Sequence, residues 1–345
     1  MMKRLQVFGS TPSPYTQKML SLLRYKQIPY DVHWGDAKGR LEALGIEPPR
    51  PVLLPVVLLE NEDKQLIATT DSTPVIRRLE KDHPERHVIP EDKALGFINY
   101  ILEDFADEYL TKFMFHYRWH YEEDAEKAGT ILPLIEFSQT LSEEELAQFK
   151  NFITQRQSER LWVVGSSEAT AELIERGFKN FMTLLNDHLA HSSFLLGNKP
   201  SSADFGFYGQ IVQLIKFDPT PRAICHEIAP RVVAWVEIMD DLSGLDAENL
   251  QWSSLEDASK NLQNILKLIG TLYVPLLLEN AKAVADESDE WEVTVEGSLW
   301  KQKTFRYQAK CLQWIRDEFN ALNDNDKQRV MSALSETGCE DVLSD

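Results

Sequence analysis

The stretch Gly9–Lys18, GSTPSPYTQK, places small hydroxyl side chains where a strand should turn into a helix. Residues 3–8, KRLQVF, are expected to form a short strand before it, and residues 14–26 carry apolar side chains at helical spacing. Ser13 comes directly before Pro14, and proline suits the first position of a helix. Ser13 therefore either caps this helix through its side-chain oxygen or presents its hydroxyl to a ligand.

The elements around this turn predict a small α/β unit of about 85 residues. The first strand, the helix and a second strand at 28–34 form a βαβ unit, whose crossover should be right-handed with parallel strands. The rest of the unit is a short helix at 37–46, a proline-rich connection at 47–55, a hairpin at 56–69 and a helix at 71–84.

From residue 90 onward the periodicity is helical. The segment 201–215 is nearly apolar and should be buried, and its Ser201 and Asp204 resemble a capping box. Residues 246–345 form a mostly helical extension in which 291–305 alternate like a hairpin with its turn at Glu296–Gly297. We therefore expect three domains, at 1–85, 90–245 and 246–345.

The chain of 345 residues carries a net charge of −19, which disfavours nucleic-acid binding. Residues 1–90 are nearly neutral, with 13 Lys and Arg against 11 Asp and Glu, so a small anion fits best there. No apolar run approaches the roughly 20 residues of a membrane span, and no secretory signal is expected. The three cysteines form no metal pattern and indicate a reducing compartment, here the cytoplasm.

Three stretches together resemble the glutathione transferase superfamily over residues 3–240. Residues 9–32 are similar to its first strand, catalytic turn and first helix, residues 53–79 to its V-P-x-L and acid-serine stretch, and residues 194–211 to its S/T-x-A-D helix start. The resemblance implies a thioredoxin-like α/β domain followed by an all-helical domain, glutathione as co-substrate and a homodimer. The last hundred residues match no part of the family pattern.

The resemblance implies that Ser13 is the catalytic residue and that Tyr15 helps to bind glutathione. A hydroxyl donated to sulfur favours thiolate over thiol, and thiolate is the nucleophile that attacks an electrophilic carbon. No cysteine lies near the turn, which favours conjugation over disulfide chemistry. Ser10 is the leading alternative to Ser13.

The remaining glutathione contacts are implied at two further places. The bond before Pro55 should be cis, so that the Leu54 backbone pairs with the cysteinyl part of glutathione; otherwise Pro55 only begins an edge strand. Asp71 and Ser72 match the acid-serine pair that binds the γ-glutamyl end, although Asp is shorter than the usual Glu or Gln; the alternative is a plain helix cap. The cation for the glycyl carboxylate is left open among Lys38, Arg40 and Arg50.

The second substrate should lie against the first long helix of the helical domain. Tyr109, Phe113, His116 and Tyr117 fall there at helical spacing and suit a hydrophobic electrophile, unless they are core residues. His116 and His120 lack the acid of an H-E-x-x-H motif, so no metal site is expected.

Two functions compete on this evidence. The first is a transferase that conjugates glutathione to a small hydrophobic electrophile. The second is an inactive protein of the same fold that acts through its extension as a binding or scaffold protein.

Overall fold

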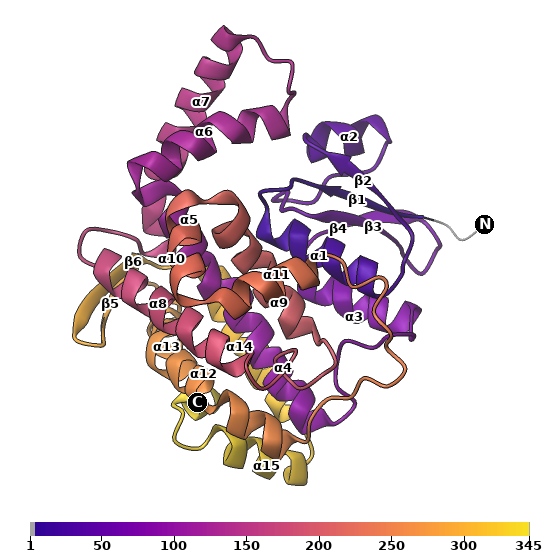
Figure 1. Ribbon diagram of the computed structural model, residues 1–345, viewed down its shortest axis with the longest axis vertical. Helices are drawn as coiled ribbons and strands as arrows, with labels where there is room; N and C mark the ends of the chain where they lie inside the picture. The colour runs from indigo at the N-terminus through magenta and orange to yellow at the C-terminus, as the bar shows by residue number, and fades with distance from the viewer. Residues whose placement is uncertain (1–3, 345) are drawn as a thin grey trace.

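The computed structural model describes residues 4–344, and their first part is a four-stranded sheet with helices on both faces (Figure 1). The strand order is β2-β1-β3-β4, with β1 and β2 parallel and the other neighbours antiparallel. This order confirms the predicted βαβαββα arrangement. The elements are β1 Leu5–Gly9, α1 Pro14–Tyr25, β2 Tyr30–Trp34, α2 Ala37–Ala43, β3 Val56–Glu60, β4 Leu66–Thr69 and α3 Ser72–Asp82.

Successive apolar side chains of the strands pack on opposite faces of the sheet and form two separate apolar layers. Val7 of β1 and Val57 of β3 belong to the main core with α1 and α3, whereas Phe8 and Val56 pack in a small cluster with Leu41 of α2. Successive side chains of a strand point to opposite faces, so one apolar stretch serves both layers. Helices therefore pack on both faces of the sheet.

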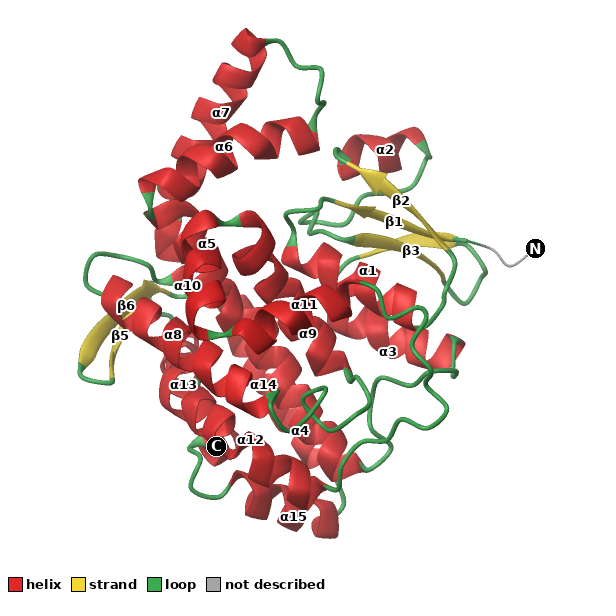
Figure 2. Cartoon of the chain, viewed as in Figure 1, coloured by secondary structure: helices red, strands yellow, loops and turns green. Residues whose placement is uncertain are grey.

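The helical part that follows is wrapped around one buried helix (Figure 2). Every residue of α9 is buried, as its apolar sequence predicts, and Ser201 and Asp204 form the predicted capping box. A Cβ at Gly209 would lie 2.4 Å from Pro14 O, so glycine is needed where α9 meets α1. The elements are α4 Lys93–Phe105, η1 Ala106–Leu110, α5 Thr111–His120, α6 Glu122–Glu136, α7 Glu143–Ser158, η2 Leu161–Val164, α8 Ala171–His188, α9 Ser202–Val212, η3 Gln213–Phe217, α10 Pro219–Ile228 and α11 Pro230–Asp240.

The long segment after residue 91 contains a turn of π-helix, η1, between α4 and α5. A π-turn adds a residue to the helical repeat and rotates the side chains that follow it. The side chains of α5 therefore do not continue the i, i+3 and i, i+4 spacing of α4.

Residues 246–344 pack against the rest of the chain. Tyr273 donates a 2.6 Å hydrogen bond to Asp104 Oδ2, Arg329 pairs with Asp92 at 2.7 Å, and Phe319 contacts Phe97. The predicted hairpin is present, with Glu296 and Gly297 in its turn at positive φ. The elements are α12 Leu255–Leu272, α13 Val274–Ala285, β5 Glu290–Val295, β6 Ser298–Lys303, α14 Arg306–Asn320, α15 Asp324–Leu334 and η4 Cys339–Leu343.

Residues 255–285 are, by length and composition alone, apolar enough to cross a membrane. Half of this segment's most apolar window is buried inside the protein, and the helices of a soluble core pass the same test. Cys225, Cys311 and Cys339 are buried and free.

Candidate functional site

The turn between β1 and α1 presents Ser13 at the start of the helix. Its backbone is extended, at φ −88° and ψ 118°, and its Oγ accepts a 3.3 Å hydrogen bond from Thr16 N. Within residues 4–344 the Ser13 hydroxyl has no acceptor for its own proton. Ser13 is therefore a helix cap that still has a hydrogen-bond donor to offer.

Ser10, the alternative hydroxyl, lies near Glu136 of α6. Only 5% of Ser10 is exposed, and its backbone N–H donates to Thr16 Oγ1 at 3.4 Å. Burial raises the pKa of the Glu136 carboxyl, and a hydrogen bond from the Ser10 hydroxyl partly offsets this rise. Ser13 is half-buried whereas Ser10 is 5% exposed, so Ser13 presents the more accessible of the two hydroxyls.

The backbone of the turn is braced by side chains that the sequence reasoning missed. Thr11 O accepts from Gln17 Nε2 at 2.8 Å and from Gln213 Nε2 at 3.1 Å, and Pro12 O accepts from Arg118 Nη1 at 3.0 Å. Arg118 is 4% exposed and pairs with buried Asp218 at 2.9 Å. Burial raises the pKa of Asp218 to about 6, and Arg118 opposes this rise.

The segments predicted to contact the glutathione peptide, at Leu54–Pro55 and at the start of α3, lie at the same end of the sheet as this turn. Phe8 pairs with Val56, so the chain leaving β1 lies beside the chain entering β3. The Leu54–Pro55 bond is cis, which confirms that prediction, and the Leu54 backbone forms no hydrogen bond within residues 4–344. Thr70 Oγ1 donates to Leu53 O at 2.9 Å, which brings the start of α3 alongside.

Ser72 lies at the first position of α3 and contacts a buried charge network. The Lys18 ammonium donates to Ser72 Oγ at 3.0 Å, to Glu103 Oε1 at 2.7 Å and to Asp107 Oδ2 at 2.6 Å. Burial alone would lower the pKa of Lys18, but the two carboxylates raise it above its ordinary value. The Ser72 oxygen thus already accepts a hydrogen bond from an ammonium group.

Asp71 precedes α3 in a left-handed conformation, at φ 75°. Its Oδ1 accepts from Thr73 N at 3.2 Å, as an N-cap does, and its Oδ2 accepts from the Tyr307 hydroxyl of α14 at 2.9 Å. The extension therefore contacts one of the residues expected to bind the γ-glutamyl end.

The other residues predicted for glutathione are placed less favourably. Tyr15 is half-buried, and its hydroxyl donates to Asp107 O at 2.7 Å, so this group faces the helical part and not the turn. Lys38, Arg40 and Arg50 are exposed, and Lys38 and Arg50 lie 3.8 and 3.9 Å from glutamates on their own segments.

The expectation of a substrate pocket on α5 needs correction. Tyr109, Phe113, His116 and Tyr117 are each at most 1% exposed and pack among aromatic rings such as Phe178. Phe178 of α8 and Tyr273 of the extension cover this face. Burial lowers the pKa of His116 to about 4, with nearby His120 adding to the effect. The alternative of core packing describes these four side chains.

Two surface pockets occur elsewhere on the molecule. One is lined by α8 residues around Glu175 and by Ile228, and the other by Arg86, Lys199 and residues 246–248. Neither includes a residue predicted for the glutathione site.

Comparison with known proteins gives two family matches. Residues 7–87 match the model of the glutathione S-transferase N-terminal domain, and residues 168–237 match that of the C-terminal domain. No curated protein matches the chain. Residues 238–345 lie outside both family matches.

Similar solved structures have low sequence identity to this chain. They include the β-etherase LigF from Sphingobium sp. strain SYK-6, with 17% identity over 69% of this chain and 95% of that one and a TM-score of 0.49. A glutathione transferase family member from Pseudomonas fluorescens Pf-5, with two glutathione bound, has 15% identity over 69% and 88% of the chains and a TM-score of 0.41. FzlA from C. crescentus has 12% identity over 74% and 98% and a TM-score of 0.42.

The two family models occur in the order, and at the places, of the sheet-bearing and helical parts described above. The chain therefore belongs to the glutathione transferase superfamily.

Proposed function

We propose that this protein is a glutathione transferase that binds glutathione at the end of the sheet and conjugates it to a small hydrophobic electrophile. The observation that carries the proposal is the Ser13 hydroxyl, whose proton has no acceptor within residues 4–344. A donor held at the N-terminus of α1 stabilises a thiolate through its hydrogen bond and through the positive end of the helix dipole.

The tripeptide would extend from the turn along neighbouring segments. The unpaired backbone of Leu54 is available to pair with its cysteinyl residue, as in an added strand. Its γ-glutamyl end would reach Asp71 and the N–H groups at the start of α3. The proposed site thus uses Ser13, Leu54, Asp71 and Ser72.

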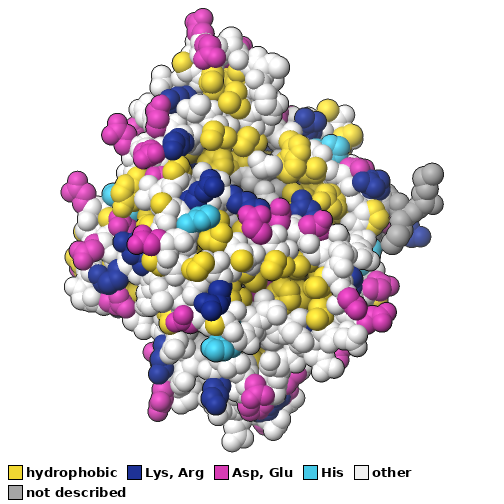
Figure 3. All heavy atoms as spheres, viewed as in Figure 1, with side chains coloured by type: hydrophobic (Ala, Val, Ile, Leu, Met, Phe, Trp, Pro, Cys, Tyr) yellow, Lys and Arg dark blue, Asp and Glu magenta, His cyan; other side chains and the backbone are white. Residues whose placement is uncertain are grey.

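The electrophile would lie between the sheet and α6, in place of the pocket predicted on α5. A Cβ on Gly35 would lie 2.6 Å from Glu136 O, so the end of α6 reaches the sheet beside the turn. Trp34 and Phe137 flank this contact and are 36% and 53% exposed. Apolar side chains gather between the α6–α7 hairpin and the sheet on the face shown in Figure 3. Such a surface suits a hydrophobic partner for the thiolate.

A second candidate function, a binding protein of this fold without transferase activity, is favoured by the contacts of Asp71 and Ser72. Each already accepts a hydrogen bond, from Tyr307 and Lys18 respectively. Such a protein would act through residues 246–344.

In either case we propose a cytoplasmic protein that neither binds nucleic acid nor enters membranes, and a homodimer as the assembly.

The test combines binding with turnover. Glutathione should raise the Tm of the full chain in a concentration-dependent way, as a ligand of the native state does. The chain should then consume a chlorinated nitroaromatic electrophile together with glutathione. No Tm shift at millimolar glutathione contradicts both the site and the activity. A shift without turnover of several electrophiles supports the second candidate.

A further inference from the structure

His116 has a buried ring nitrogen without a partner. The residue is 0% exposed, and its Nδ1 lies 2.8 Å from Ser166 Oγ. Its Nε2 forms no hydrogen bond within residues 4–344, and Glu175 Oε1 of α8 lies 3.6 Å away. That separation is too long for a hydrogen bond. A buried polar atom of this kind needs an explanation.

His120 completes a group of three ligand side chains. It lies one helical turn beyond His116, and the two imidazole rings stack with their centroids 4.5 Å apart. One ligand atom each from His116, His120 and Glu175 lie within 4.8 Å of one another. Two imidazoles and a carboxylate are a common donor set for zinc and similar ions.

The hydrogen bond to Ser166 favours a cation at this point. When the His116 Nδ1–H donates to Ser166 Oγ, the lone pair on Nε2 faces the Glu175 carboxylate with no proton between them. A metal-bound histidine commonly donates its other ring N–H to such a partner. With metal–nitrogen and metal–oxygen bonds of about 2.0–2.2 Å, two ligands of a tetrahedral ion lie about 3.4 Å apart, close to the separation found.

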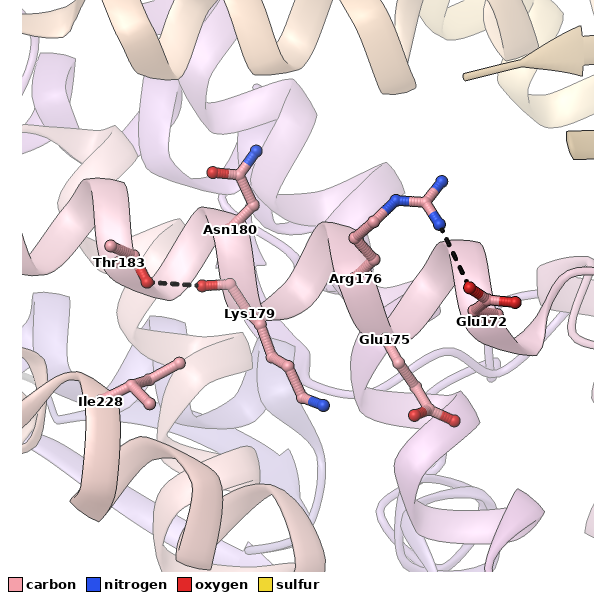
Figure 4. Close-up of a pocket in the computed structure, with 7 residues that line it drawn as sticks. All are labelled: Glu172, Glu175, Arg176, Lys179, Asn180, Thr183 and Ile228. Carbon is pink, nitrogen blue, oxygen red and sulfur yellow. Dashed lines mark hydrogen bonds and ion pairs between the residues drawn. The ribbon is translucent and has the colours of Figure 1, made fainter. Parts of the chain in front are cut away.

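The Glu175 carboxylate accepts a hydrogen bond on one side and faces a surface pocket on the other. The Tyr121 hydroxyl donates to Glu175 Oε1 at 2.7 Å. Glu175 also lines a surface pocket of about 550 Å³, together with Glu172, Lys179 and other residues of α8. In Figure 4, Glu175 projects from α8 away from the Arg176–Glu172 ion pair. Of the three ligand side chains Glu175 lines this pocket, which leaves room for water as a further ligand on its side of the ion.

We propose that His116, His120 and Glu175 form a binding site for a divalent transition-metal ion of the zinc type, which joins α5 to α8. The spacing of the two histidines is visible in the sequence, but the acid that the H-E-x-x-H motif would supply comes instead from α8, 55 positions after His120. The site uses no residue of the proposed glutathione site.

The test uses the full chain after removal of metal with a chelator. Titration with Zn²⁺ alone, followed by calorimetry, should show one ion bound per chain, and Co²⁺ should give the visible spectrum of a four- or five-coordinate ion. Zn²⁺ should also raise the Tm. Glu175→Gln keeps an acceptor for Tyr121, so it should fold, but it should weaken Zn²⁺ binding by about tenfold or more, as should His120→Ala.

The matched control is Glu172→Gln, which removes an exposed carboxylate from the same helix and pocket. Its affinity for Zn²⁺ should equal that of the unmodified chain. The proposal is overturned if the unmodified chain binds less than stoichiometric Zn²⁺. It is also overturned if Glu175→Gln binds as tightly as Glu172→Gln.

Discussion

The Tyr307 hydroxyl donates a 2.9 Å hydrogen bond to Asp71 Oδ2, across 236 positions of sequence. The donor belongs to the extension that lies outside both family matches, and the acceptor precedes the helix expected to bind the γ-glutamyl end of glutathione. The extension therefore contacts the proposed site directly and can change its affinity.

Removal of this contact should strengthen glutathione binding. Asp71 Oδ1 is held by Thr73 N, so Tyr307→Phe leaves the carboxylate oriented and frees Oδ2 for the ligand's ammonium group. We expect the Kd for glutathione, measured by calorimetry, to fall a few-fold. Glutaryl-cysteinylglycine, which lacks that ammonium group, should bind both proteins equally. Equal gains for both ligands would show that Tyr307 acts by covering the site and not through Asp71.

Ser13 should set the pKa of the bound thiol. Hydrogen bonds to charged groups contribute about 1.5–3 kcal/mol, so Ser13→Ala should raise that pKa by about 1 to 2, as measured by thiolate absorbance during a pH titration. Loss of the cap should also reduce the free energy of unfolding by about 1 kcal/mol.

Two variants control for this effect. Ser13→Thr keeps both the hydroxyl and the cap and should restore the lower pKa of the thiol. Ser10→Ala should leave it unchanged, because Ser10 is 5% exposed and lies next to Glu136. If Ser10→Ala raises the pKa and Ser13→Ala does not, Ser10 is the residue that stabilises the thiolate.

Arg118 should act on the thiol indirectly, as a positioning residue. Lysine keeps the charge, but one ammonium group cannot serve Asp218, Gln213 and Pro12 O together as the guanidinium does. Arg118→Lys should therefore loosen the turn and raise the pKa of bound thiol, in addition to lowering Tm. The exposed Arg222→Lys should change neither quantity. A lower Tm with an unchanged thiol pKa would reduce Arg118 to a purely structural role.

Much of the secondary structure could be predicted from sequence because its signals are local. Pro14 and the apolar spacing of α1 mark a helix start, and Glu296–Gly297 marks a hairpin turn. The side-chain partners of the site could not be predicted in the same way. Lys18, Arg118 and Tyr307 reach partners on elements 54 to 236 positions away, and nothing in the local pattern names those partners.

The pocket on α5 was predicted wrongly because the partners of that face are also distant in sequence. Helical spacing correctly assigns Tyr109 and Phe113 to one side, since their ring centroids lie 5.2 Å apart. Phe178 of α8 and Tyr273 of the extension cover that side. The packing of distant segments decides whether an aromatic face lines a pocket or the core, and this information is not local.

Two half-buried carboxyls, Asp104 at the end of α4 and Glu108 in η1, should make stability depend on pH. Burial, together with neighbouring acids, raises the pKa of Glu108 to about 8 and that of Asp104 to about 7. Between about pH 4 and 8 these two carboxyls therefore bind more protons in the folded chain than in the unfolded chain, and they make the free energy of unfolding fall as pH rises. One proton corresponds to about 1.4 kcal/mol per pH unit. Denaturant unfolding at several pH values measures this slope.

Asp104→Asn should make that slope shallower. Its amide oxygen can still accept from Tyr273, whereas the titrating group is gone. The exposed Asp63→Asn should preserve the slope. An unchanged slope in Asp104→Asn would mean that Asp104 is ionised in the folded chain throughout this range.

The most direct measurement is a crystal structure of the full chain grown with saturating glutathione. Our account predicts the sulfur within hydrogen-bond reach of Ser13 Oγ, the cysteinyl backbone paired with Leu54 and the γ-glutamyl end at Asp71 and Ser72. Glutathione bound at any other place, or absent at saturating concentration, would contradict it.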